Sequence, residues 1–590
     1  MRISPKVAGA AAVAIGMTVA LSACGSGSSS SSGGSGTKGG TLRLVGEDEN
    51  SSYDWAGAYD SISYSSLRAY TRQLYTNPSS NDPAERTKIV PDIAAGMPDV
   101  SGDGKTYTVK LNKDVQWNVG GTGRTVTAAD VVRGIKMLCN PANGTGPVDY
   151  FTDSLVGMKA FCDGFADVDA TSATAIKAYE EGHQFAGVTA VDDATVKFTL
   201  EAPASDFVRF LTLPASSPRP IEMMSYVPDS PDGRQHLISD GPYLIPDGGY
   251  VPNKSLKLVR NPVWKADTDT TRKAYVDVIE TTYGGTSDSI QQQIEAGTAD
   301  MAVSNEPVPN AKLASLISQN SSQLHINPTG GPRYLVFNTV GGSDGVKNLK
   351  VRQAISYAVN KAAIAQLLGG PRVESVASQI FSPSTFGEGF KKIDPYATKD
   401  NSGNTAKAKD LLAQAGYPNG ITIKLAYADA GVNPKMATSV QTDLEAAGIK
   451  IVPTPIPASD YYGKYLQKED ITKSGKWDVA LAKWSADWEG TAQRTFFSPL
   501  LDGRGYTDGS SNFGAYNNDT ADKLADEALA ATSSGAAASK WNEVDAVIMA
   551  DAPWVPLVED NQANFNSSRL KNFQYQFNAL NGDITDVSVG

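Results

Sequence analysis

The residue types that most often carry out chemistry are scarce in this chain of 590 residues. Its three histidines, His183, His236 and His325, lie far apart, and neither an HExxH motif nor a G-x-G-x-x-G that opens a βαβ unit is present. Gly102–Thr106 contains Gly-Lys-Thr, but a strand pattern follows it instead of a helix, so it reads as a hairpin turn and not as a phosphate loop. We therefore predict no catalytic residues, no metal and no cofactor. A pair of carboxylates of the glycosidase type is the enzymatic arrangement that the sequence leaves open.

The composition is that of a folded, acidic protein. The chain has 52 basic and 64 acidic residues, a net charge of −12, with 41% apolar and 20% charged residues. The acidic balance argues against a nucleic-acid partner, which would need a basic face. At roughly 100–200 residues per domain, the length predicts two or more structural lobes.

The N-terminal segment has the pattern of an export signal. Met1–Lys6 contains two basic residues and precedes the uncharged apolar run Val7–Ala20, which is too short to span a bilayer. The next residues, Leu21–Gly25 (LSACG), resemble the lipobox of bacterial lipoproteins. The resemblance implies a signal peptide over 1–23, acylation of Cys24 (palmitate) and a Gly/Ser tether over 24–40. An ordinary secretory signal with an incidental cysteine is the alternative.

Cysteine usage agrees with an exported protein. If Cys24 carries lipid, Cys139 and Cys162 remain as one pair in an oxidising compartment. We predict a disulfide between them. Two buried free thiols are the alternative.

Hydrophobic periodicity indicates strands and helices that alternate in the second half of the chain, which is typical of an α/β lobe. Thr127–Asp130 is a capping box ahead of a helix at Val131–Leu138. Val351–Leu368 repeats apolar residues at helical spacing and predicts a single helix. The expected strands include Thr41–Val45, Thr106–Leu111, Val188–Val191, Thr195–Leu200, Tyr334–Asn338, Ile421–Ala426, Ile449–Val452 and Trp477–Ala482, the last without an obvious partner. No long uncharged apolar run follows the signal, so we expect no transmembrane helix.

Several segments, in the same order, resemble one protein family. They are Ile89–Met97 with Ser101–Trp117, Arg124–Val132, Asp240–Tyr243 with Val259–Trp264, Gln292–Ala302, Phe337–Thr339 with Val351–Ala354, and Ala408–Tyr417. The family is that of the extracytoplasmic solute-binding proteins of peptide-type ABC transporters, also called the oligopeptide- or dipeptide-binding family. Each segment alone is a weak signal, but their shared order is specific.

This resemblance implies an α/β fold, a two-lobed periplasmic-binding-protein-like clamp of type II with an extra subdomain in its first lobe. The implied parts are lobe I at 41–328, with the subdomain at about 65–235, lobe II at 329–561, and a return to lobe I at 562–590. The chain should cross between the lobes near Asn327–Gly331 and near Glu559–Asn564. A cleft between the lobes would close on the ligand.

The resemblance also implies which residues hold the ligand. Trp484–Trp488 resembles the family's W-x-x-D-Y segment, in which the aspartate, here Asp487, takes an α-ammonium group. The main chain of Lys483 and Ser485 would pair with a peptide as an added strand. Further candidates are Trp484 and Trp488 as aromatic walls, Trp55, Tyr59 and Tyr64 on lobe I, and Arg333 as a partner for a carboxylate. The alternatives are a surface role for Asp487, core packing for Trp484 and Trp488, and a brace at the hinge for Arg333.

The function implied is that of a lipid-anchored, monomeric substrate-binding component of an ABC importer on the outer face of the bacterial cytoplasmic membrane. It would capture a small solute, first of all a peptide, and pass it to the permease subunits. The alternatives are a binding protein of the same fold for an oligosaccharide, an opine or a metal complex, a surface receptor without a transport role, and a secreted hydrolase.

Overall fold

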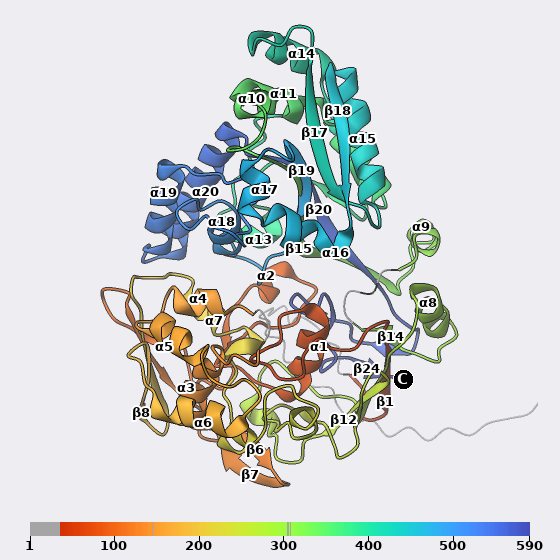
Figure 1. The fold of residues 1–590 in the computed structure, drawn as a ribbon. Coiled ribbons are helices and arrows are strands. Elements are labelled where there is room, and N and C mark those ends of the chain that lie inside the picture. Colours follow the sequence, from red (N-terminus) through yellow and green to blue (C-terminus); the bar gives the residue numbers. More distant parts are fainter. Residues whose placement is uncertain (1–35, 144–145, 304–305, 307) are drawn as a thin grey trace, which may run out of the picture. The chain divides into compact units, whose positions relative to one another are not determined.

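The computed structural model describes residues 36–143, 146–303, 306 and 308–590 (Figure 1). Cys24, the signal-peptide prediction and most of the predicted tether lie outside the described residues. In the part that is described, no helix is both long and apolar enough to cross a membrane.

Lobe I contains the first strand, β1, and is built on a mixed sheet (Figure 1). The strand order of this sheet is β10-β12-β13-β1-β14, and β11 also pairs with β12. β1 runs parallel to β13 and β14, whereas β12 is antiparallel to β10, β11 and β13. The strands are β1 (Thr41–Val45), β10 (Tyr243–Leu244), β11 (Tyr250–Val251), β12 (Ser255–Arg260), β13 (Val278–Thr282) and β14 (Met301–Ala302). The C-terminal strands β21 (Leu570–Lys571) and β24 (Ser588–Val589) contribute Leu570 and Val589 to the same core.

A four-stranded antiparallel sheet, β4-β5-β9-β8, extends lobe I. Its strands are β4 (Asp99–Val100), β5 (Thr106–Lys110), β8 (Val188–Asp192) and β9 (Thr195–Thr199), and the helices between them are α3 (Ala128–Met137), α4 (Val148–Thr152), α5 (Met158–Phe165) and α6 (Ala173–Gly182). The capping box of Thr127 and Asp130 at the start of α3 is confirmed. Gly102–Thr106 forms the turn between β4 and β5, as predicted.

Lobe II is built on a second sheet, with the strand order β16-β20-β15-β19-β17-β18. The strands are β15 (Leu324–Phe337), β16 (Ser375–Val376), β17 (Ile421–Ala428), β18 (Ile449–Ile456), β19 (Val479–Lys483) and β20 (Trp554–Phe565). Successive residues of β15 alternate between two cores, because side chains of a strand point to opposite faces: Leu335 and Phe337 pack on one face, and Tyr334 and Val336 on the other.

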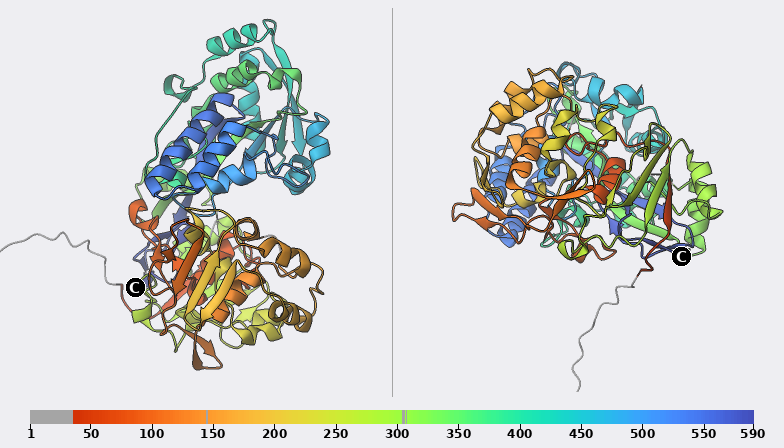
Figure 2. Two further views of the ribbon diagram at one scale, coloured as in Figure 1. Left: turned by 90° about the vertical axis from the view of Figure 1, so that its left-hand side faces the viewer. Right: turned by 90° about the horizontal axis from the view of Figure 1, so that it is seen from below.

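Helices cover both faces of the lobe II sheet. The face of Leu335 is covered by α11 (Leu349–Ala358), α12 (Lys361–Leu367), α14 (Thr405–Gln414) and α15 (Asn433–Ala446). The face of Tyr334 is covered by α18 (Arg494–Leu500), α19 (Asp519–Leu529) and α20 (Ser534–Asp551), and Figure 2 (left) shows α19 and α20, in blue, lying over the sheet.

Two long antiparallel strands, β15 and β20, connect the lobes. Their register runs from Leu324 opposite Phe565 to Val336 opposite Trp554, and it shifts between Pro328 and Gly331. Phe565 packs in a cluster with Val45 of β1, whereas the other ends of both strands lie in the core of lobe II. The candidate site described below lies beside this pair of strands.

Some predicted elements differ from the structure. Val351–Leu368 is not one helix, because the chain is extended at Val359 and Asn360 caps a new helix, α12, by accepting a hydrogen bond from the Ala363 N–H. β18 continues to Ile456 through two prolines, which an edge strand tolerates. The strand predicted at Trp477–Ala482 is β19, and its partners are β15 and β17.

Candidate functional site

A cavity of about 470 Å³ lies between residues of the two lobes. It is lined from lobe I by the residues that open α1 (Ser61–Tyr70) and by the C-terminal segment, and from lobe II by the end of β19 and the loop after it. The lining residues are Tyr59, Asp60, Ser61, Tyr64, Thr329, Tyr462, Gln467, Lys483, Trp484, Ser485, Ala486, Asp487, Ser511, Phe513, Phe577, Asn578 and Leu580.

The carboxylate of Asp487 is the main charged group of this cavity. The hydroxyl of Tyr59 donates a hydrogen bond of 2.6 Å to its Oδ1, and the hydroxyl of Tyr150 donates one to its Oδ2. Burial raises the pKa of Asp487, and these two hydrogen bonds lower it in part. No Lys, Arg or His nitrogen of the described residues lies within 4 Å of this carboxylate. A half-buried anion with only neutral partners favours a ligand that brings a positive charge.

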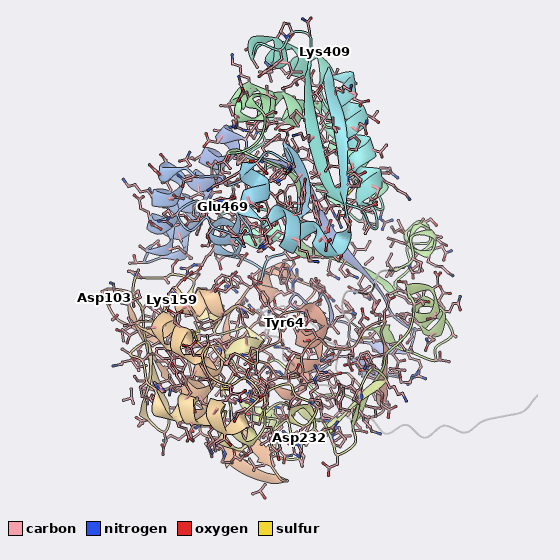
Figure 3. All side chains as sticks on the ribbon, viewed as in Figure 1. Tyr64, Asp103, Lys159, Asp232, Lys409 and Glu469 are labelled. Carbon is pink, nitrogen blue, oxygen red and sulfur yellow. A yellow bond between two sulfur atoms is a disulfide. The ribbon has the colours of Figure 1, made fainter. Side chains whose placement is uncertain are left out.

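Helix α1 brings the lobe I tyrosines to this carboxylate. Asp60 caps the helix by accepting a hydrogen bond of 2.9 Å from the Ser63 N–H, which places Tyr59 just before the helix. Tyr64, labelled in Figure 3, lies in the first turn. The hydroxyl of Tyr64 is buried and has no hydrogen-bond partner among the described residues. Burial, and then the charge of Asp487, raise its pKa, so Tyr64 remains a protonated phenol beside the site.

The main chain before Asp487 presents an open edge to the cavity. The N–H of Trp484 donates to the carbonyl of Pro332 (3.1 Å) and that of Ala486 to the carbonyl of Gly330 (3.2 Å). Because alternate residues of an extended chain point their N–H groups to opposite sides, the main-chain groups of Lys483 and Ser485 face away from β15. The Lys483 N–H donates to the hydroxyl of Tyr462 (3.2 Å), which also lines the cavity. This edge is suited to pairing with an extended ligand.

Six of the residues predicted from the sequence line this cavity together: Tyr59, Tyr64, Lys483, Trp484, Ser485 and Asp487. Trp484 is fixed by a hydrogen bond of 2.8 Å from its Nε1 to the carbonyl of Thr495.

Trp55 has a different place from the one expected. It has no exposed surface, stacks on Trp117 with ring centroids 6.2 Å apart, and lies under the guanidinium of Arg219. The expectation that Trp55 faces a ligand is therefore wrong, because a large aromatic side chain in a polar stretch has been recruited to the core of lobe I.

Trp488 and Arg333 are also absent from the lining of the cavity. Trp488 is buried, packs against Tyr150 and Phe210, and donates from Nε1 to the carbonyl of Thr491 (3.1 Å), so the alternative of core packing applies. Arg333 on β15 forms an ion pair of 2.6 Å with Asp560 on β20, which makes it a brace between the strands that connect the lobes.

Tyr150 is a candidate site residue that was not predicted from the sequence. It comes from α4 in lobe I, outside the segments that resemble the family. Its ring packs on Phe210 and Trp488, with centroids 5.3 Å away in each case, and aims its hydroxyl at Asp487. Tyr462 in the helical turn Tyr461–Leu466 was also missed, as were Phe513 and Phe577, because aromatic residues in loops carry no periodic signal.

Buried ion pairs hold the segment after Asp487 on lobe I. Arg86 binds both carboxylate oxygens of Glu489, at 2.5 and 2.7 Å, and Arg494 pairs with Asp206 at 2.8 Å. Both pairs join residues of different lobes. In the described part of the chain, no group of three or more His, Cys, Asp or Glu side chains is arranged to hold a metal ion.

This chain is similar to known proteins in both sequence and fold. A sequence model described as bacterial extracellular solute-binding proteins, family 5, matches residues 88–508, most of the chain. The chain belongs to this family. The resemblance seen in the sequence is thereby confirmed, and so is the two-lobed α/β fold.

The relatives of this chain are distant in sequence. Heme-binding protein A of Haemophilus influenzae is 26% identical over 535 residues, which cover 87% of this chain and 85% of that protein. The glutathione-binding protein GsiB of Shigella dysenteriae is 24% identical over 487 residues, with coverage of 80% and 81%. Among solved structures, the clavulanic acid biosynthesis oligopeptide binding protein 2 has a TM-score of 0.82 at 24% identity and covers 94% of this chain and 96% of its own. At this identity the likeness shows the fold alone.

Proposed function

We propose that this protein is the ligand-capturing component of an ABC importer and that its ligand is a short peptide with a free α-ammonium group, bound by Asp487. The observation that carries the proposal is the carboxylate of Asp487, which lines a cavity between the lobes and has two phenols but no cation beside it in the described structure. An ammonium group would complete this site with a charge-assisted hydrogen bond.

The main-chain edge supports a peptide over other cations. Lys483 and Ser485 turn their backbone groups away from β15 and toward the cavity, so a peptide can add to this edge as a strand whatever its side chains are. The aromatic residues Trp484, Phe513 and Phe577 supply apolar surface for those side chains. Relatives named for oligopeptide and glutathione binding agree with this ligand class.

Lys483 also fits the second charge of a peptide. Its side chain belongs to the lining of the same cavity, and none of the described carboxylates is within 4 Å of its ammonium group. Because Asp487 and Lys483 line one cavity, they can meet the ammonium and carboxylate ends of one short peptide.

We further propose that the protein returns its ligand unaltered and is anchored by a lipid on Cys24, with the permease of the importer as its partner. Secreted Cys24→Ser protein should be recovered in the medium, whereas the unmodified sequence should remain with the membrane fraction. Wild-type protein in the medium at the level of the variant would contradict the anchor.

The test of the ligand proposal is isothermal titration of trialanine and N-acetyl-trialanine into the wild-type protein and Asp487→Asn. We expect the substitution to lower the affinity for trialanine at least tenfold, about 1.4 kcal/mol. The affinity for the N-acetyl peptide, which binds more weakly, should stay unchanged. Asp103→Asn, at an exposed hairpin of lobe I, is the matched control. Normal binding of trialanine by Asp487→Asn would overturn the proposal.

A further inference from the structure

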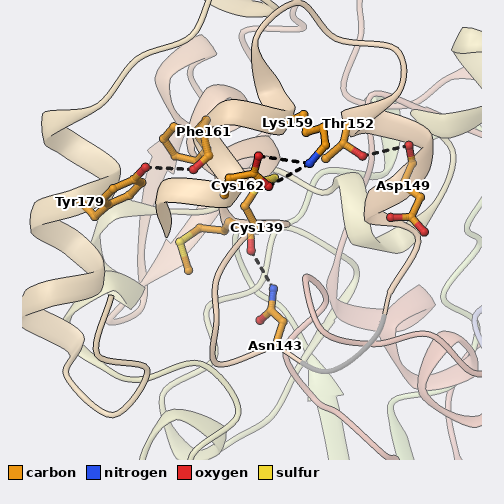
Figure 4. Close-up of a disulfide and its surroundings, with 10 residues drawn as sticks. Cys139, Asn143, Asp149, Thr152, Lys159, Phe161, Cys162 and Tyr179 are labelled. Carbon is orange, nitrogen blue, oxygen red and sulfur yellow. Dashed lines mark hydrogen bonds and ion pairs between the residues drawn. A yellow bond between two sulfur atoms is a disulfide. The ribbon is translucent and has the colours of Figure 1, made fainter. Parts of the chain in front are cut away.

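The Cys139–Cys162 disulfide brackets the segment that carries Tyr150. This predicted disulfide is present, with the two Cα atoms 4.8 Å apart. Cys139 follows the end of α3, Cys162 lies in α5, and the short helix α4 with Tyr150 comes between them. Figure 4 shows the disulfide together with Asp149 and Thr152, which mark α4. The disulfide therefore closes a loop around a residue of the ligand site.

Helix α4 depends on its flanks for its position. It has five residues, fewer than a helix needs to be stable by itself. On one flank, the side-chain amide of Asn143 donates to the carbonyl of Met137 at the end of α3 (2.7 Å). On the other flank, Leu155 pairs with Leu200 of the adjoining sheet, and α5 begins at Met158. The disulfide ties these two flanks to each other.

The Tyr150 side chain leaves this loop and contacts residues outside it. Its ring lies against Phe210 and Trp488, and its hydroxyl reaches the Oδ2 of Asp487 in lobe II. A hydrogen bond tolerates little displacement, because its energy falls steeply with distance and angle. Small movements of α4 would therefore weaken the hydrogen bond to Asp487 before they disturbed the packing of the lobe I core.

We propose that the Cys139–Cys162 disulfide is a positioning element of the ligand site, which holds Tyr150 in hydrogen-bonding distance of Asp487. The inference rests on the proposed function for its effect on affinity, but the contact itself can be tested without any ligand. If the disulfide served stability alone, its removal would lower the melting temperature and leave the Tyr150–Asp487 contact in place.

A double-mutant cycle separates these roles. The variants are Cys139→Ser/Cys162→Ser, Tyr150→Phe and their combination, and the measured quantity is the Kd for trialanine. We expect the paired serine variant and Tyr150→Phe each to weaken binding at least threefold, and the combination to be no weaker than Tyr150→Phe within a factor of about 1.5. Independent, multiplying effects, or normal binding by the paired serine variant, would overturn the proposal.

Two further variants serve as a control and as a replacement for the paired serine variant. Lys159→Ala, inside the same loop, removes an exposed ion pair with Asp163, just beyond the loop, and should leave the Kd unchanged. If the paired serine variant does not fold, Asn143→Ala takes its place, because it removes the hydrogen bond to Met137 that holds the same flank of α4. Asn143→Ala should weaken the binding of trialanine in the wild-type background but not in the Tyr150→Phe background. A normal Kd for Asn143→Ala would then count against the proposal.

The ligand-free experiment uses ¹⁹F resonances of 3-fluorotyrosine placed at position 150. Asp487→Asn defines the chemical shift of Tyr150 without its carboxylate partner. The resonance of the paired serine variant should move toward that shift, and an unchanged resonance would overturn the positioning role. If trialanine does not bind the wild-type protein, the proposed function fails, while this measurement still decides the role of the disulfide.

Discussion

The hydroxyl of Tyr59 in lobe I donates a hydrogen bond of 2.6 Å to the Oδ1 of Asp487 in lobe II. When ionised, the carboxylate thus has only neutral partners among the described residues and can pair with a cationic ligand. The same contact links the two lobes at the cavity. Both roles depend on Asp487 being ionised.

Acidification should therefore weaken the binding of cationic peptides. Burial holds the pKa of Asp487 above its usual value, and the carboxylate is lost as the pH falls through that raised pKa. Tyr59→Phe removes a hydrogen bond that favours the charged form, so the midpoint of the loss should move to higher pH. Titration of trialanine across the acidic range checks this. The control is Tyr226→Phe, at a tyrosine that stacks on His236 and does not line the cavity, and it should leave the midpoint unchanged. An unshifted midpoint in Tyr59→Phe would contradict the expectation.

Lys483→Met should discriminate between peptides by their carboxyl end. The substitution keeps a long apolar side chain and removes the ammonium group. We expect a loss of threefold or more in affinity for trialanine and little change for trialanine amide, whose end is uncharged. Calorimetry with the two peptides measures the difference. Equal losses for both peptides would mean that Lys483 contributes packing and not charge.

The pair of Arg86 and Glu489 should matter for stability far more than an exposed pair does. Both side chains are almost fully buried, and Arg86 binds both oxygens of Glu489. Glu489→Gln would leave a buried guanidinium without its anion, at a cost of about 3–5 kcal/mol in the free energy of unfolding. Urea denaturation provides the measurement. The control is Lys159→Ala, whose pair is largely exposed and is expected to contribute less than about 1 kcal/mol; similar losses in both variants would refute the prediction.

Asp545 should make the stability of lobe II depend on pH. Its carboxyl lies in the core, accepts hydrogen bonds from Gln379 and from the N–H of Ile380, and burial raises its pKa to about 7. A raised pKa contributes stability that is present below the unfolded value and is lost as the pH rises through about 7.

Asp545→Asn removes this dependence. Relative to the variant, the wild-type protein should lose up to about 1.4 kcal/mol per pH unit between the unfolded and folded pKa values. Thermal melting at several pH values measures it, with the exposed Asp267→Asn as the control. A constant difference in melting temperature between the wild type and Asp545→Asn would show that Asp545 does not titrate in this range.

Local sequence signals predicted much of the fold. The capping box at Thr127 and Asp130 marks the start of α3, and period-two alternation marks β1 and β9 to within a residue of their ends. The break at Val359 and Asn360 was missed, because the apolar spacing continues across it and only the cap of Asn360 reveals the second helix.

The candidate site could be predicted only where the chain resembles its family. Asp487 and the edge at Lys483 and Ser485 follow from the segment around Trp484. Tyr150 could not be found in this way, because it reaches Asp487 from 337 residues away in the sequence and lies outside the segments that resemble the family. The error at Trp55 has the opposite cause, since an aromatic residue that suits a ligand also suits a core.

The central claim is that a cationic peptide is taken up intact between the lobes. Native mass spectrometry of the mature protein incubated with equimolar trialanine and N-acetyl-trialanine tests it most directly. The account predicts a one-to-one complex whose added mass is that of unmodified trialanine and which is lost in Asp487→Asn. A protein that retains neither peptide, that retains both equally, or that releases cleaved peptide would contradict it.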